Sequence, residues 1–214
     1  NSVLELYNKG IEITRIQKCF SVGMLGKNRR LVPTRWSITA TDDIVSKSLV
    51  EQIMEFDLID TCQVFSYNHI GNYFSVIVFP SRWMFEMQEA WYDQQGNIGF
   101  GSDFEDVRGL DHYPTTAGAH FASRLGVAEY LFKNKVQAAA MVLREIRPEY
   151  AVPLGVWQVR EGVRMAMKQN PKIVSSFEEG LDLACKSLSI DKKEWLAKST
   201  LQKERRQKSI SDFF

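Results

Sequence analysis

The sequence predicts an α+β fold in which an antiparallel or mixed sheet packs against several helices. Helical and strand-like hydrophobic patterns are interspersed along the chain, but they do not repeat as the strand–helix–strand units of a doubly wound sheet. The chain has 214 residues, of which 44% are apolar and 25% are charged, a composition typical of a globular protein with a sizeable core. We expect one globular domain over residues 1–200 and an exposed, flexible tail over residues 201–214.

The N-terminal part of the chain is expected to be mainly helical. Apolar side chains at helical spacing predict two short helices, in residues 3–7 and 13–20. Glycines then interrupt the pattern and a basic loop follows. Residues 36–40 are interpreted as a short strand.

A longer helix is predicted directly after that strand. Thr41 stands where a helix N-cap belongs, and the helical pattern extends to about Phe56. Asp42 and Asp43 would then lie in the first turn, where the helix dipole favours anions. We interpret these two carboxylates as dipole partners first and as metal ligands second.

The middle of the chain has the pattern of an antiparallel sheet. Three runs rich in β-branched and aromatic residues predict strands. These runs are residues 62–67, 73–79 and 83–92. Residues 93–111, which are rich in Gly, Asp and Asn, are interpreted as a long loop. The continuous apolar run at residues 138–143 predicts a buried strand.

Helical patterns dominate the remainder of the chain. Each predicted helix follows a capping residue, a proline or a polar break. The four helices are predicted over residues 116–133, 156–167, 176–188 and 192–205.

Composition excludes a membrane span and a disulfide framework. The longest apolar runs, such as residues 76–80, are far shorter than the ~20 residues that a transmembrane helix needs. Cys19, Cys62 and Cys185 are widely spaced and form no CxxC or zinc motif, which is typical of a reducing compartment. We expect a cytoplasmic protein without a secretory signal. Because the chain starts at Asn1 rather than at methionine, we also expect that a segment precedes it.

The net charge of +1 conceals a segregation of charge along the chain. Residues 1–40 carry a net charge of +5, residues 41–159 carry −8, and residues 160–214 carry +4. Basic ends attract a phosphate backbone by releasing its counterions. Solvated lysine-rich helices would give the same pattern, so the charge alone leaves both interpretations open.

The last eight residues contain a pattern that is typical of a docking peptide. In one helical or 3₁₀ turn, Ile210, Phe213 and Phe214 stand at i, i+3 and i+4 and would project from one side. Gln207 lies one turn earlier and offers both a donor and an acceptor. This pattern resembles the motif with which replication and repair proteins bind the sliding clamp PCNA. The alternative is that the aromatic residues cap the core of this protein.

A basic loop forms the first candidate site of the folded part. Lys27, Arg29 and Arg30 lead to Arg35 and Trp36, so cations that can hold phosphates precede an aromatic ring that can stack on a base. The alternative is an ordinary surface loop followed by a tryptophan in the core. The sequence does not decide between them.

A second candidate is the expected start of the helix over residues 116–133. Thr115 and Thr116 offer hydroxyl groups, and Gly118 allows a close approach to free backbone N–H groups. Together these groups suit an anion or a nucleotide phosphate. A simple N-cap would require the threonine alone, and that interpretation also stays open.

An acidic stretch is the third candidate. Asp103, Asp106, Asp111 and His112 could hold a divalent cation, with Glu105 beside them. Sequence spacing alone does not bring these side chains together, and acidic loops are commonly just solvated. The histidines form no HExxH or catalytic triad spacing, so we assign no catalytic residue and no cofactor.

Several segments together resemble the archaeal NreA family of DNA repair proteins, over its C-terminal portion. The resemblance rests on residues 31–43, the Trp83 region, residues 116–118, Arg124 and residues 148–160. It implies a PCNA-binding protein of the DNA-damage response, archaeal and associated with the nucleoid. It also implies longer relatives whose N-terminal region often holds a cysteine zinc motif. Because Arg160 ends the last matching segment, we add it to the candidate DNA or nucleotide contacts.

Two hypotheses about function follow. In the first, the protein is a non-catalytic repair factor that the clamp recruits and that binds DNA, nucleotide or other repair proteins. In the second, it is a metal-dependent nucleotide- or nucleic-acid-processing enzyme tethered to the clamp, which uses Arg35, Thr116 and the acidic residues.

Overall fold

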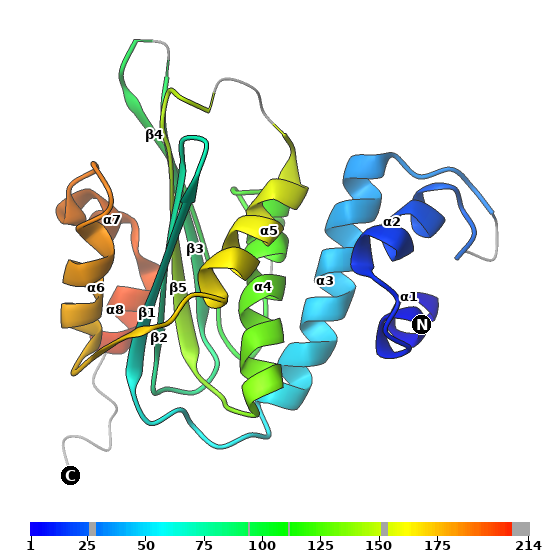
Figure 1. Cartoon of the computed structure of the whole chain (residues 1–214), viewed down its shortest axis with the longest axis horizontal. Coiled ribbons are helices and arrows are strands. Elements are labelled where there is room, and N and C mark those ends of the chain that lie inside the picture. The colour runs from blue at the N-terminus through cyan, green and yellow to red at the C-terminus, as the bar shows by residue number, and fades with distance from the viewer. Residues whose placement is uncertain (26–28, 94, 111, 151–153, 207–214) are drawn as a thin grey trace.

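The fold is α+β, as predicted, and is built on one mixed sheet (Figure 1). A computed structural model describes residues 1–25, 29–93, 95–110, 112–150 and 154–206. In this part of the chain, six strands pair in the order β4-β3-β5-β2-β1-β6. None of the helices in the described ranges is long and apolar enough to cross a bilayer.

The strands confirm most of the predicted sheet. Their bounds are β1 Cys62–His69, β2 Asn72–Phe79, β3 Phe85–Tyr92, β4 Ile98–Glu105, β5 Ala139–Ile146 and β6 Lys172–Val174. Neighbouring strands run antiparallel except β3 and β5, which run parallel. The four predicted strands from residue 62 onward correspond to β1, β2, β3 and β5.

The helices also follow the predicted order, with one addition. Their bounds are α1 Ser2–Asn8, α2 Ile13–Ser21, α3 Thr34–Ile53, α4 Gly118–Asn134, α5 Val156–Met167, α6 Phe177–Cys185, α7 Lys192–Lys198 and α8 Thr200–Arg206. The helix predicted over residues 192–205 is interrupted at Ser199, which adopts an extended conformation. The expected tail from residue 201 begins within α8, where Leu201 and Gln202 are buried.

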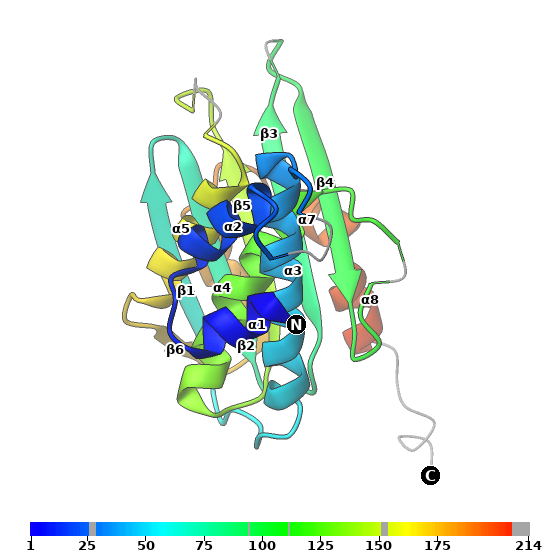
Figure 2. The same cartoon turned by 90° about the vertical axis from the view of Figure 1, so that its right-hand side faces the viewer.

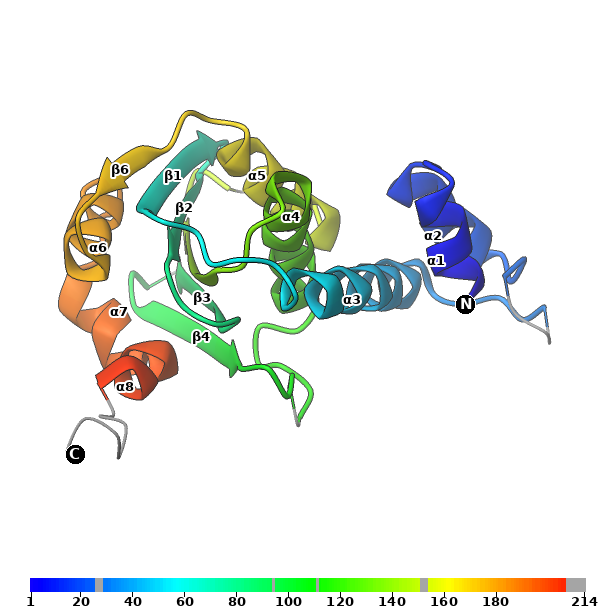
Figure 3. The ribbon, with the colours of Figure 1, turned by 90° about the horizontal axis from the view of Figure 1, so that it is seen from below.

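Helices cover both faces of the sheet. Seen from below, α3, α4 and α5 lie on one side, with α1 and α2 beyond α3, and α6, α7 and α8 lie on the other side (Figure 3). Each face has its own buried apolar cluster. The sheet therefore separates a larger helical layer from a smaller one.

The strand predicted at residues 36–40 is wrong, because α3 runs without a break from Thr34. The hydroxyl group of Thr41 donates to the carbonyl oxygen of Ser37 (2.7 Å) and does not cap a helix. The buried side of α3 includes small polar residues such as Ser37 and Thr41. The first half of the helix therefore lacks the regular spacing of apolar residues that predicts a helix from sequence. Asp42 and Asp43 consequently lie inside the helix and not in its first turn.

The long loop predicted over residues 93–111 is also wrong in its central part, because Ile98–Glu105 forms β4. The glycines of this stretch suggested a loop, but in the structure they lie in a strand and leave room for neighbouring side chains. A Cβ on Gly99 would lie 2.4 Å from the Trp91 ring, and a Cβ on Gly101 would lie 2.9 Å from Cγ2 of Thr116. The short edge strand β6 was not predicted at all.

Candidate functional site

The three longest helices of the described chain, α3, α4 and α5, begin toward the same end of the molecule (Figures 1 and 2). None of them has a side-chain N-cap, whereas side chains cap α1, α6 and α7. The first N–H groups of an uncapped helix lack intrahelical partners and carry partial positive charge. We call this region the three-helix end; it comprises Arg35 and Trp36 on α3, residues 116–118, and residues 155–157.

The three helix starts lie in close contact. A Cβ on Gly118 would lie 2.8 Å from Cγ2 of Val156 on α5 and 2.9 Å from Oγ1 of Thr39 on α3. The hydroxyl group of Thr39 donates to the carbonyl oxygen of Arg35 (3.1 Å), one turn earlier. Gly118 therefore does permit a close approach, but the approach it permits is that of two neighbouring helices.

Exposed cations and aromatic rings lie at this end. Arg29, Arg30 and Arg35 are exposed, and Trp36 is 60% exposed, so this tryptophan is not part of the core. Trp157, in the first turn of α5, is 44% exposed although the sequence did not single it out as a site residue. Lys27 lies outside the described residues. Exposed arginines beside exposed tryptophans suit a single-stranded nucleic acid, which offers both phosphates and unstacked bases.

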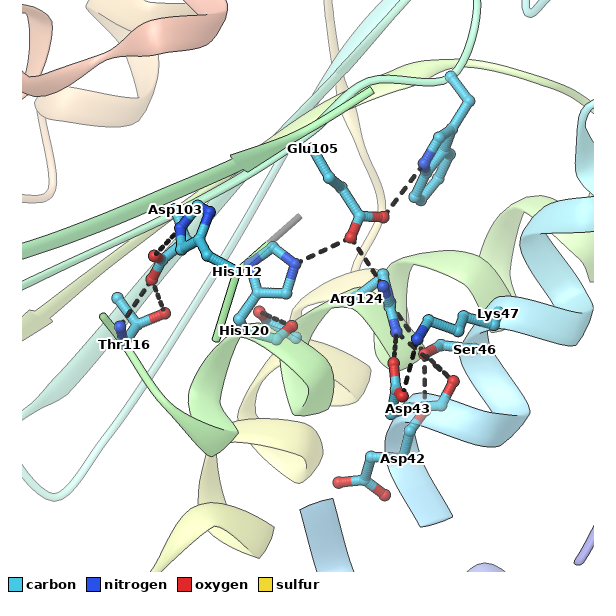
Figure 4. Close-up of polar contacts among 12 residues, drawn as sticks. Asp42, Asp43, Ser46, Lys47, Asp103, Glu105, His112, Thr116, His120 and Arg124 are labelled. Atoms are coloured by element: carbon cyan, nitrogen blue, oxygen red, sulfur yellow. Dashed lines mark hydrogen bonds and ion pairs between the residues drawn. The ribbon is translucent and has the colours of Figure 1, made fainter. Parts of the chain in front are cut away.

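The two predicted threonines bind one of the predicted acidic residues, and Figure 4 shows the contacts of Thr116 with it. Asp103 accepts from the backbone N–H of Thr115 and of Thr116, both at 2.6 Å, and from the Thr116 hydroxyl group at 2.6 Å. Burial raises the pKa of Asp103, but hydrogen bonds from Thr116 and Thr115 outweigh it and hold that pKa below its ordinary value. These donors therefore serve a buried carboxylate within the fold and not an external phosphate.

The other acidic candidates do not converge on a metal site. Asp106 pairs with Arg108 at 2.6 Å in the turn after β4. Nε2 of His112 lies 3.8 Å from Oδ1 of Asp103. Asp111 lies outside the described residues. Across the described ranges, no group of three or more His, Cys, Asp or Glu side chains is placed to hold a metal ion.

Glu105 points inward and joins a buried polar network (Figure 4). Its carboxylate accepts from Nη1 of Arg124 (2.7 Å), from Nε2 of His120 (3.1 Å) and from Nε1 of Trp83 (3.3 Å). Burial raises the pKa of Glu105, but His120 and Arg124 outweigh it and lower that pKa. Arg124 also donates to Ser46 (2.9 Å) and pairs with Asp43, so the network ties β4 and α4 to α3.

Arg160 is buried and does not reach an external ligand in this structure. It is 0% exposed, and its Nη1 donates to Oδ1 of Asp42 at 2.7 Å. Gln17 on α2 donates to the same oxygen at 3.0 Å. The nucleic-acid contact predicted for Arg160 is thus replaced by a buried ion pair that holds α5 to α3, because the same side of α5 carries the buried Val159 and Val163.

The Asp42 carboxylate predicts a pH dependence of stability. Burial raises the pKa of Asp42 to about 6, against the opposing effect of Arg160; Oδ2 has no partner within the described residues. A carboxyl group whose folded pKa is raised contributes stability below its unfolded pKa and loses it as pH rises through the folded pKa. Between pH 5 and pH 7 the wild-type protein should therefore lose about 1 kcal/mol more than Asp42→Asn. Urea unfolding of both proteins at the two pH values measures this, and parallel pH dependences would contradict it.

Two family models match the chain. The model described as Archaeal Nre, N-terminal matches residues 1–95, and the model described as Archaeal Nre, C-terminal matches residues 105–213. The chain belongs to the archaeal Nre family. The resemblance to this family is thereby confirmed, but it is not limited to the C-terminal portion, because residues 1–95 match the N-terminal model.

Curated relatives extend this result. The Nre chain is 41% identical to DNA repair protein NreA of Archaeoglobus fulgidus, over 98% of this chain and 53% of the relative. It is 39% identical to DNA repair protein NreB of the same organism, over 97% of this chain and 54% of the relative. It is 36% identical to DNA repair protein NreA of Haloferax volcanii, over 92% of this chain and 49% of the relative. The chain thus spans about half the length of the curated relatives it matches, and no solved structure matches it.

Sequence reasoning missed two buried charged groups of this Nre chain. Arg144 on β5 pairs with Glu89 on β3, and the two line a pocket near the starts of α4 and α5. Glu86 on β3 accepts from the N–H groups of Thr200 (2.6 Å) and Leu201 (3.3 Å), so a buried carboxylate caps α8. The available signal was the presence of charged residues inside runs that otherwise have the pattern of buried strands.

Proposed function

We propose that this chain is a DNA-binding part of a DNA repair protein and that the three-helix end contacts the DNA. Three of its relatives are named DNA repair proteins. The observation that carries the proposal is the placement of exposed Arg35, Trp36 and Trp157 at the starts of α3 and α5, two helices that have no side-chain N-cap. Each of these features attracts a different part of a nucleic acid.

Phosphates and bases would be bound by different groups. Arginine side chains and helix N-termini bind phosphate oxygens without reading sequence. Tryptophan rings stack on any base, because every base has a π-face. We therefore expect binding that favours single-stranded DNA, tolerates many sequences and weakens with salt.

Arg35→Ala and Trp36→Ala test this surface. Loss of one phosphate contact should reduce the slope of log affinity against log salt by roughly 1, and loss of one stacking ring should cost about 1–3 kcal/mol of binding free energy. Fluorescence anisotropy with a labelled single-stranded oligonucleotide over a salt series measures both effects. Lys192→Ala is the control, because it removes one positive charge from α7 on the other face of the sheet.

Equal weakening by Lys192→Ala and Arg35→Ala would contradict this assignment. Binding would then depend on overall charge and not on the three-helix end. We expect Arg35→Ala and Trp36→Ala to weaken binding and Lys192→Ala to leave it unchanged.

We also propose that PCNA recruits this protein through Gln207, Ile210, Phe213 and Phe214. These residues lie outside the described part of the chain, so the proposal rests on their sequence pattern. Its structural support is the position of α8, which directly precedes Gln207. Glu86 holds the first turn of α8, and near its end the guanidinium group of Arg205 lies 4.2 Å from the centroid of the Phe177 ring. The motif therefore follows a helix that is fixed to the sheet.

The enzyme hypothesis has no specific observation in its favour. The hydroxyl group of Thr116 is bound to Asp103, and Asp106 is paired with Arg108. Thr116, Asp103 and Asp106, three of the residues that this hypothesis would use, are thus engaged in contacts within the fold, whereas Arg35 is exposed. We accordingly base the proposed function on binding.

A further inference from the structure

A pocket of about 280 Å³ lies beside the three-helix end. Its lining residues come from the carboxyl ends of β3 and β5 and from the starts of α4 and α5, and they include Glu89, Thr116, Gly118, Arg144, Tyr150 and Gly155. β3 and β5 are the parallel pair of the sheet. The carboxyl ends of parallel strands are where open α/β sheets place their ligands. We call this cavity the β3–β5 pocket.

We propose that the β3–β5 pocket receives a single nucleobase of the DNA that is bound at the three-helix end. This inference rests on the proposed function, and it adds a defined site for one base to a surface that binds the backbone. The volume is just below the range of about 300–1,000 Å³ that is typical of pockets for drug-sized ligands and cofactors. The pocket thus suits one base or one nucleotide better than a larger ligand.

The floor of the pocket presents an acceptor next to a donor. Arg144 is 6% exposed, and Nε and Nη2 both donate to Oδ1 of Asn72 (3.0 and 2.5 Å). Nη2 also donates to Gln158 (3.2 Å), and Nη1 donates to Oε2 of Glu89. A guanidinium group has five N–H donors, so one N–H of Nη1 has no partner within the described chain. Oε1 of Glu89 likewise has no partner among the described residues.

This pair of free groups matches the hydrogen-bonding edge of a base. Bases carry N–H groups beside carbonyl oxygens or ring nitrogens, and proteins read an extruded base through that edge. A carboxylate oxygen would accept from the base, and the neighbouring guanidinium N–H would donate to it. The ion pair between Glu89 and Arg144 keeps the two groups adjacent before any ligand arrives.

The walls of the pocket suit the faces of a base. Val156, Val159 and Ile146 supply apolar surface. The hydroxyl group of Tyr150 accepts from the N–H of Leu154 at 2.6 Å, which holds its ring beside the pocket. Gly155 has φ +81° and ψ 179°, a conformation that is essentially restricted to glycine. This glycine lets α5 begin at the pocket wall.

Two DNAs that differ by one base test the inference. One is a duplex with a single unpaired 2-aminopurine, and the other carries an abasic residue at the same position. The wild-type protein should bind the first at least tenfold more tightly. Ile146→Trp fills the pocket from the end of β5. It should reduce the ratio of the two affinities to about one and leave the affinity for abasic DNA unchanged.

Further variants keep the test decisive. Glu89→Gln exchanges a charged acceptor for an amide and should also lower the ratio of the two affinities. This variant therefore tests the pocket even if Ile146→Trp does not fold. Asp182→Asn on α6, on the other face of the sheet, should leave the ratio unchanged. Melting temperatures close to that of the wild type show that each variant is folded.

The possible failures can be told apart. If the wild-type protein binds both DNAs equally, the base pocket is overturned while the proposed DNA surface stands. A ratio that survives both Ile146→Trp and Glu89→Gln also overturns the pocket. If the wild-type protein binds neither of these DNAs nor a single-stranded oligonucleotide, the proposed function fails and the pocket fails with it.

Discussion

Arg124→Ala is expected to destabilise the fold by about 3–5 kcal/mol, because it removes one partner from a buried ion-pair network. Arg124 is 1% exposed and bonds to Glu105 and Asp43. Alanine would leave the Glu105 carboxylate, which is 2% exposed, without its cation. Urea unfolding at neutral pH measures the loss as a change in the free energy of unfolding.

Arg108→Ala is the matched control for this measurement. The Arg108 side chain is 86% exposed and pairs with Asp106 at the surface. Exposed ion pairs contribute about 1 kcal/mol or less, so this variant should unfold almost as the wild type does. If Arg124→Ala cost no more than Arg108→Ala, the network would not be what holds β4 and α4 to α3.

Deletion of Phe213 and Phe214 is expected to abolish binding to PCNA. Burial of one isoleucine and two phenylalanines contributes roughly 5–9 kcal/mol, and the ordering of the peptide offsets part of this. A dissociation constant in the micromolar class is therefore expected for the intact chain. Without the two rings most of the apolar contact is lost, and isothermal titration calorimetry should detect no heat of binding.

Ser211→Ala is the control within the motif, since this position carries none of the specified side chains. It should bind PCNA as the wild type does. If the two rings contact PCNA and do not cap the core of this protein, the deletion should leave the melting temperature unchanged. PCNA binding that persists after the deletion would show that another surface of the protein contacts the clamp.

The fold could be predicted from the sequence where apolar side chains recur at the regular spacing of a helix or a strand. The predicted helix over residues 156–167 coincides with α5, whose buried side includes Val159, Val163 and Ala166. α3 was partly missed because Ser37, Thr41 and Ser46 fill buried positions that apolar residues usually occupy. Small hydroxyl side chains can be buried in a helix when they donate to carbonyl oxygens of the preceding turn, as all three do here. A hydrophobic pattern does not reveal this.

The candidate site was harder to predict because its residues are far apart in the sequence and come close together only when the sheet forms. Thr116 and Asp103 were assigned to separate sites, since the stretch that contains Asp103 was predicted as a loop and not as the strand β4. Once β4 is a strand, Asp103 points at the turn before α4 and satisfies its donors. Arg160 follows the exposed Trp157 by three residues, so the two start from neighbouring parts of the surface of α5, but the Arg160 side chain is buried.

Photo-crosslinking of DNA to the folded protein shows directly whether DNA contacts the three-helix end. Single-stranded DNA that carries 5-iododeoxyuridine reacts with aromatic side chains on which it stacks, and mass spectrometry identifies the modified peptide. We expect adducts on Trp36 or Trp157, which lie at the starts of α3 and α5. Adducts confined to α6, α7 or α8 would contradict it, because the DNA would then lie on the other face of the sheet.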